Sequence, residues 1–231
     1  MEKELASKDF IVGVPSGHLA YSNFYMHLIQ WMSGSPVMPV ISISNRVDVN
    51  RSQIITAALK TQRNIVYLDY DALPMQDYKT MMSYLLEDFK TYDIVVAPVR
   101  GVDGNILIKP LNADFKFPQH AIDYKPFEIE AGSFTFAGVS YNLLKQLKPL
   151  SQYGLVDNRT VPLYVAYNNQ TSEEYAFCHK AKKQYHAKIA CDPRLRVSHF
   201  KAIPLPPPIP MEEMTAIQKQ SQNSQPEKLI L

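Results

Sequence analysis

Short apolar runs alternate along the chain with segments in which apolar residues recur at helical spacing. Four runs rich in β-branched residues have the pattern of buried strands, namely Phe10–Pro15, Val37–Ile43, Asn64–Pro74 and Asp93–Pro98. Apolar residues three and four apart predict helices between them, at Tyr21–Trp31, Arg51–Lys60 and Tyr78–Phe89. Strands that alternate with helices in this way form mostly parallel sheets with right-handed crossovers. The pattern therefore predicts an α/β fold with a doubly wound, mostly parallel sheet of the nucleotide-binding type.

The regular alternation of strands and helices ends at about Gly101. Short apolar segments and a connection rich in proline and aromatic residues follow. Beyond it we expect a strand at Ser133–Ala137, a helix at Val139–Lys148, an extended segment at Val161–Tyr167, a helix from Ser172 to about Gln184, and a last strand at Ala187–Cys191. Nothing in the segments before Gly101 requires a second domain.

The C-terminal segment differs in composition from the rest. Five prolines fall within Ile203–Pro210, which favours a polyproline-like extended chain, and the residues after it are mostly polar. We expect one domain at residues 1–203 and a proline-rich, polar tail at residues 204–231. A disordered tail and a short docking helix that presents Met211, Met214 and Ile217 are the two alternatives for its end.

Composition excludes several classes of protein. Hydrophobic residues make up 46% of the 231 residues, charged residues 20%, and the net charge of +2 gives no reason to expect a nucleic acid or a membrane surface as partner. Cys178 and Cys191 form neither a disulfide framework nor a zinc motif. No apolar run reaches the roughly 18 residues of a transmembrane segment, and Met1–Asp9 lacks the apolar core of a signal peptide. We expect a cytoplasmic protein without a transmembrane segment.

The chemistry centres on Asp69 and Asp71, at the carboxyl end of the third predicted strand. Open α/β sheets bind their ligands at this edge. On an extended chain, residues two apart point the same way, so both carboxylates can face one bound ion. Their mutual repulsion calls for a cation, and oxygen ligands suit Mg²⁺ or Mn²⁺. The alternative is a strand end whose aspartates begin a turn, because D-x-D is short and common.

Seven segments in order carry a resemblance to a known family. They are Phe10–Pro15, Asn50–Gln53 ahead of a helix, Val66–Pro74 with the D-x-D, Tyr92–Pro98, Ala131–Phe134, Ser172–Cys178 and Cys191–His199. Together they resemble the nucleotide-diphospho-sugar transferases of the GT-A fold, in particular family 2-like inverting glycosyltransferases and the small single-domain versions that archaeal viruses encode. The resemblance covers roughly Ile11 to His199. It implies a single Rossmann-like sheet with a smaller antiparallel part on the acceptor side, and a location in the cytoplasm of an infected host.

The resemblance also implies roles for individual residues. Asp71 and His199 would bind Mn²⁺ or Mg²⁺, and Asp69 would contact the ribose or a metal-bound water. Without the family, a histidine after a strand is usually solvated or hydrogen bonded. The nucleotide sugar would also lie against Pro15, Arg51 and Gly132. A helix-starting surface arginine is the alternative for Arg51, and a simple turn glycine is the alternative for Gly132.

Glu174 stands where inverting members have their general base. It would accept the proton of the acceptor hydroxyl as that oxygen attacks the anomeric carbon. The chain has Glu-Glu here where the family often has Glu-Asp, and a glutamate reaches one methylene further. Both acids also suit the first turn of a helix, where they interact favourably with its dipole. Glu173 is the fallback for the base.

The sequence therefore predicts a metal-dependent, hexosyltransferase-type glycosyltransferase. It would move a sugar from a UDP- or GDP-sugar to a hydroxyl acceptor on a glycan, protein or lipid, with inversion; retention is the alternative outcome, because the fold and the D-x-D are common to both. The alternative is a non-catalytic nucleotide-sugar-binding or assembly protein of the same fold, suggested by Glu174 and the proline-rich tail. A sugar nucleotidyltransferase ranks last, because Val14–His18 is not a glycine-rich basic loop. No G-x-x-x-x-G-K-[ST] loop supports a kinase or nucleoside triphosphatase.

Overall fold

The computed structural model describes most of the chain between residues 9 and 205. The described residues are 9–16, 22–35, 37, 39–101, 103–112, 114, 117, 125–150, 153–156, 159–165, 171–200 and 204–205. The helices are α2 (Ser22–Trp31), α3 (Val47–Thr61), α4 (Tyr78–Asp88), α5 (Tyr141–Leu144) and α6 (Glu173–Tyr185). The strands are β1 (Phe10–Ser16), β2 (Pro39–Ile43), β3 (Asn64–Leu68), β4 (Ala72–Pro74), β5 (Ile94–Val96), β6 (Ile108–Pro110), β7 (Phe127–Gly132), β8 (Phe136–Val139), β9 (Tyr153–Val156), β10 (Arg159–Pro162), β11 (Ile189–Cys191), β12 (Val197–Phe200) and β13 (Pro204–Leu205).

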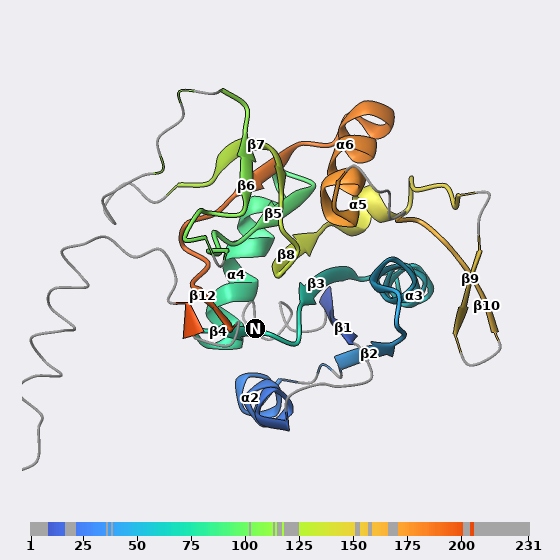
Figure 1. The fold of residues 1–231 in the computed structure, drawn as a ribbon, viewed down its shortest axis with the longest axis horizontal. Helices are drawn as coiled ribbons and strands as arrows, with labels where there is room; N and C mark the ends of the chain where they lie inside the picture. The colour runs from blue at the N-terminus through green and yellow to red at the C-terminus, as the bar shows by residue number, and fades with distance from the viewer. Residues whose placement is uncertain are drawn as a thin grey trace, which may run out of the picture.

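A mixed sheet of eight strands forms the centre of the molecule, in the order β2-β1-β3-β8-β5-β11-β7-β6 (Figure 1). β2, β1 and β3 are parallel to one another, as are β5 and β11. β8 lies antiparallel between β3 and β5, and β7 is antiparallel to both β11 and β6. Six of the eight strands therefore run in one direction, which makes the sheet mainly parallel and compatible with a Rossmann-like fold.

Helices cover both faces of the sheet, and alternate strand residues pack against each face. On one side, Phe10, Val12 and Val66 form a core with α2 and α4. On the other side, Ile11 and Ile65 form a core with α3, α5 and α6. Because successive strand side chains point to opposite faces, a strand that is buried on both sides is apolar at every position. This explains why the strands appear in the sequence as unbroken apolar runs.

Two smaller sheets lie beside the main one. β4, β12 and β13 form an antiparallel sheet, and β9 pairs with β10 in a hairpin that lies at the far right of Figure 1, beyond α3. β13 contains Pro204 and Leu205, so the first two residues assigned to the tail pair with β12. The rest of the predicted tail, including Met211, Met214 and Ile217, lies outside the described residues.

Most predicted elements match observed ones, but several regions differ. The predicted strand Ser133–Ala137 spans the turn between β7 and β8, and only Tyr141–Leu144 of the predicted helix Val139–Lys148 forms α5. α3 begins at Val47, so the Asn50–Gln53 segment lies inside the helix and not ahead of it. Its N-cap residue, Arg46, makes no side-chain capping bond, which is why no capping signal marked the start. None of the helices in the described ranges is long and apolar enough to cross a bilayer.

Candidate active site

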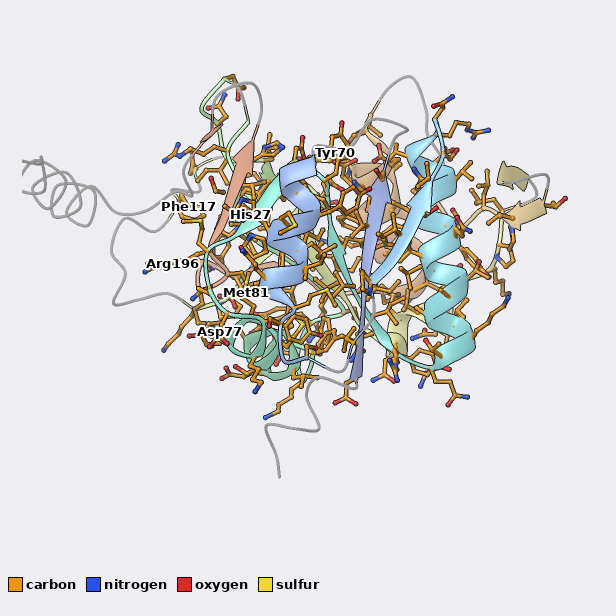
Figure 2. All side chains as sticks on the ribbon, turned by 90° about the horizontal axis from the view of Figure 1, so that it is seen from below. His27, Tyr70, Asp77, Met81, Phe117 and Arg196 are labelled. Atoms are coloured by element: carbon orange, nitrogen blue, oxygen red, sulfur yellow. The ribbon has the colours of Figure 1, made fainter. Side chains whose placement is uncertain are left out.

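A turn between β3 and β4 carries the two aspartates. The backbone N–H of Asp69 donates to the carbonyl of Thr135 at 3.0 Å, and the N–H of Ala72 donates to the Asp69 carbonyl at 3.0 Å. The chain is therefore turned and not extended between Asp69 and Asp71, so the alternation expected of a strand does not apply. Figure 2 labels Tyr70, the residue between them, near the top of the view, above Asp77.

Asp71 forms a pair with a histidine from the far end of the chain. β12 is antiparallel to β4 with His199 opposite Ala72, so His199 lies beside the turn. Its Nε2 is 3.3 Å from Oδ2 of Asp71, and both side chains are almost wholly buried. Its Nδ1 lies 3.0 Å from the carbonyl of Arg100, which can only accept, so Nδ1 donates. This bond fixes the ring and directs Nε2 at the carboxylate.

Asp69 has a different partner. Nη2 of Arg51, from α3, lies 3.3 Å from Oδ1 of Asp69, and Nε lies 3.2 Å from Oε1 of Glu173. The guanidinium carbon is 5.5 Å from the ring centre of Tyr67 and 5.2 Å from that of Phe134. Only 3% of the Arg51 side chain is exposed, so in this structure it faces the carboxylates and not the solvent. Burial lowers the pKa of Arg51, but the negative charges of Asp69 and both glutamates raise it by more than burial lowers it. Arg51 therefore remains a cation.

Helix α6 begins at the same place with two acids in unlike surroundings. Glu173 is buried against Arg51, and burial, together with the charge of Glu174, raises its pKa to about 7. Glu174 is half-buried, and its Oε1 accepts a hydrogen bond of 3.4 Å from the hydroxyl of Ser133. That hydroxyl also lies 3.0 Å from the hydroxyl of Thr135. Glu174 therefore keeps an accessible carboxylate, whereas Glu173 is used in an ion pair.

Negative charge gathers at this edge of the sheet. Burial, together with the charges of Asp71 and Glu174, raises the pKa of Asp69 to about 6, although Arg51 and His199 act in the opposite direction. Each of these groups therefore lies close enough to Asp69 to change its ionisation. Such an arrangement favours a bound cation, which would compensate the carboxylates.

Asp71 and His199 are the residues that could hold a metal ion. Their oxygen and nitrogen converge at 3.3 Å, and a mixed carboxylate and imidazole set suits Mn²⁺ better than Mg²⁺. Across the described ranges, no group of three or more His, Cys, Asp or Glu residues is arranged to hold a metal. Two protein ligands nevertheless fit a cation that takes its other ligands from substrate phosphates and water.

The two remaining predicted contacts lie at the same edge or next to it. Pro15 is near the end of β1, where it is buried opposite Ser42 of β2. Gly132 ends β7, and a Cβ atom there would lie 2.7 Å from Cγ2 of Val96. Packing against Val96 of β5 thus accounts for this glycine without a ligand.

Three contributors to the site were not singled out in the sequence. They are the hydroxyls of Ser133 and Thr135 and the carbonyl of Arg100. Ser133 lies in Ala131–Phe134, one of the seven segments that carry the resemblance, so the sequence could have indicated Ser133 as a site residue. No pattern in the sequence identifies a carbonyl that orients a histidine.

Comparison with known proteins gives the fold but no family. No protein-family model matches the chain, and no curated protein matches it. Among solved structures, the crystal structure of A197 from STIV is similar, with a TM-score of 0.58, over 83% of this chain and 85% of A197. The two sequences are 15% identical. At that identity the likeness shows a common fold and nothing further.

Proposed function

We propose that this protein is a metal-dependent glycosyltransferase that transfers a sugar from a nucleoside-diphosphate donor to a hydroxyl group. The observation that carries the proposal is the pair of Asp71 and His199. The resemblance to GT-A enzymes requires these two residues to meet, they lie far apart in the sequence, and their side chains are 3.3 Å apart.

The residues divide the work as follows. Asp71 and His199 would hold the divalent cation, which would neutralise the charge that develops on the diphosphate leaving group. Asp69 would bind the donor beside it, and Arg51 would keep Asp69 oriented from the protein interior. Arg51 then acts as a positioning residue and does not need to reach the nucleobase.

Glu174 is the better candidate for the base. It has the accessible carboxylate, held by Ser133, and it lies on the same edge as the aspartates. It would accept the proton of the acceptor hydroxyl as the oxygen forms its bond to the anomeric carbon and the bond from that carbon to the diphosphate breaks. Single displacement of this kind inverts the anomeric configuration.

Thermal shifts with UDP and GDP, each with Mn²⁺, Mg²⁺ or a chelator, test the proposal. We expect stabilisation that needs both nucleotide and cation, is larger with Mn²⁺, and is lost in Asp71→Asn and His199→Gln. Asp9→Asn is the matched control, because Asp9 is exposed at the start of β1, at the other edge of the sheet. Stabilisation that persists with chelator would contradict the metal site. Donor binding without transfer to any hydroxyl acceptor would favour a non-catalytic binding protein.

A further inference from the structure

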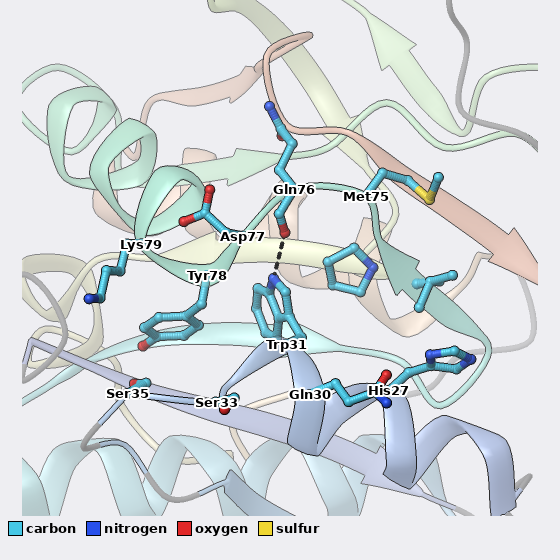
Figure 3. Close-up of a pocket in the computed structure, with 12 residues that line it drawn as sticks. His27, Gln30, Trp31, Ser33, Ser35, Met75, Gln76, Asp77, Tyr78 and Lys79 are labelled. Carbon is cyan, nitrogen blue, oxygen red and sulfur yellow. Dashed lines mark hydrogen bonds between the residues drawn. The ribbon is translucent and has the colours of Figure 1, made fainter. Parts of the chain in front are cut away.

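A groove lies between helix α2 and the segment from β4 to the first turn of α4 (Figure 3). We call it the α2–β4 groove. Its volume is about 660 Å³, which falls in the range of roughly 300–1,000 Å³ that small-molecule sites occupy. α2 supplies one wall, with His27, Gln30 and Trp31, and residues 73–79 supply the other. Nothing in the proposed transfer reaction uses it.

Trp31 is held in place at the middle of the groove. Its indole Nε1 donates to the carbonyl of Gln76 at 2.9 Å, which Figure 3 marks with a dashed line. Its ring packs edge to face against Tyr78, with ring centres 5.1 Å apart, and against Phe136 at 6.1 Å. The indole is still partly exposed. A fixed, partly exposed indole is a platform on which the apolar C–H face of a sugar ring can stack.

Polar side chains beside this platform are not committed to other contacts. His27, Gln30 and Lys79 line the groove and are exposed. Within the part of the chain that the structure describes, none of these three side chains makes a hydrogen bond or an ion pair. Gln30 offers both donors and an acceptor, and His27 offers one of each in its neutral form. A ligand with many hydroxyl groups, which both donate and accept, matches this set.

Two other ligand classes fit less well. A phosphate-bearing ligand would need a cluster of basic groups, whereas Lys79 is accompanied by Asp77. An extended peptide would need a sheet edge for pairing, and β4 is only three residues long and ends in Pro74, which has no N–H to donate. The lining therefore favours an uncharged ligand recognised by stacking and side-chain hydrogen bonds.

We propose that the α2–β4 groove binds a neutral oligosaccharide, with one sugar ring on Trp31 and its hydroxyls bonded to Gln30 and His27. The groove wall begins at Leu73, two residues after Asp71. Figure 2 shows His27 between Tyr70, in the aspartate turn, and Asp77, at the other end of the groove. A bound chain would thus extend from the carboxylate cluster along α2. The proposal rests on the groove alone and does not require transferase activity.

The chain has a single tryptophan, so its fluorescence reports on this groove. The test titrates the full chain with malto-, cello-, chito- and manno-oligosaccharides, and follows Trp31 emission together with saturation-transfer NMR of the sugar. We expect a saturable response to at least one series. Gln30→Ala should weaken it about tenfold, as expected for the loss of hydrogen bonds. Gln184→Ala, which removes an exposed glutamine of α6, should leave it unchanged.

Asp71→Asn separates this proposal from the transferase proposal. It should abolish cation-dependent nucleotide binding and leave oligosaccharide binding intact, so each proposal can fail without the other. Silence of both readouts across all four series overturns the groove proposal. So does a response that Gln30→Ala leaves unchanged, or a response to nucleotides alone.

Discussion

Glu173 and Glu174 are sequence neighbours that the fold places in different surroundings. Glu173 is buried in an ion pair with Arg51, and Glu174 lies half-buried beside Ser133. The sequence left the choice of base open between them, since both stand in the first turn of a helix. The contacts favour Glu174, because a base must reach the acceptor.

Replacing each glutamate by glutamine tests this assignment. Glu174→Gln should lower kcat about 100- to 10,000-fold, the usual contribution of a general base, and leave donor binding unchanged. Glu173→Gln should keep transfer within about tenfold of the native rate, since the amide oxygen of glutamine can still face Nε of Arg51. The measurement is initial rate against acceptor concentration, with thermal stability as the control for folding. The reverse ranking would make Glu173 the base.

Gly132 allows a second test at the scale of one atom. In Gly132→Ala the new methyl group would meet Cγ2 of Val96 at 2.7 Å in a buried sheet. We expect a loss of about 1–3 kcal/mol in the free energy of unfolding, as for other overpacked cores. Denaturant unfolding of this variant, of Val96→Ala and of the double variant measures the coupling. If the contact with Val96 is the cause, the double variant should lose less free energy of unfolding than the two single variants lose together. If the two losses add exactly, the glycine has a ligand-binding or backbone role instead.

At the scale of elements, an arginine ties the segment before His199 to helix α4. The guanidinium of Arg194 contacts Asp88 at 2.6 Å, Glu87 at 2.8 Å and Asp192 at 3.1 Å. Asp192 follows β11 directly, so the cluster fixes where the chain leaves the sheet towards β12. Burial and the neighbouring charge of Asp192 raise the pKa of Asp88, and Arg194 only partly offsets this.

This cluster predicts a pH dependence of stability. A carboxyl group whose pKa is higher in the folded state stabilises the fold at low pH and loses this contribution as the pH rises. For Asp88 the loss begins near the ordinary aspartate pKa of about 4 and continues up to its raised folded value. Asp88→Asn keeps an acceptor for Arg194 and cannot ionise, so its Tm advantage over the native chain should grow from pH 5 to pH 8. At this chain length, each kcal/mol of difference in the free energy of unfolding shifts the Tm by about 2–4 °C. A constant difference across that range would show that Asp88 is ionised throughout.

The strands that sequence patterns could find are those buried on both faces. β1, β5 and β11 are short apolar runs with clear ends, and each was predicted close to its observed position, whereas β3 begins at Asn64 as predicted but ends at Leu68 and not at Pro74. β7 was missed although Phe127, Ile129 and Ala131 alternate with two glutamates, which is the pattern of a strand with one buried face. Ser133–Thr135 forms the turn between β7 and β8, although Phe134 and Thr135 have high strand propensity. The pairing of β8 with β3 and β5 sets where this turn falls, and local propensity does not.

At the scale of the whole molecule, the centre of the sheet should be its most stable part. β8 pairs with β3 on one side and β5 on the other, and all its residues are buried, whereas β2 lies at an edge with Ile41 and Ile43 exposed. Native-state hydrogen exchange should therefore find the slowest amides in Phe136–Val139 and much faster ones in β2. Equal rates in both would mean that the sheet opens as one unit.

The sequence could predict only those parts of the site that lie next to a recognisable strand or helix. Asp69 and Asp71 follow a recognisable strand, but the meeting of Asp71 with His199 depends on the antiparallel pairing of β4 and β12. A family resemblance supplied that expectation, and no local pattern would have done so. The burial of Arg51 could not be anticipated, because it depends on α3 beginning four residues before it and on Tyr67 and Phe134 enclosing the guanidinium.

The position of β8 also has a consequence for synthesis on the ribosome. β3 and β5 are both complete by residue 96, but the strand that belongs between them begins at residue 136. Until residues 97–135 have been added, which takes on the order of seconds at 5–20 residues per second, the nascent chain carries an unpaired apolar strand edge. Such edges recruit other chains. We therefore expect the yield of this protein in a recombinant host to depend on how well chaperones shield that edge during translation.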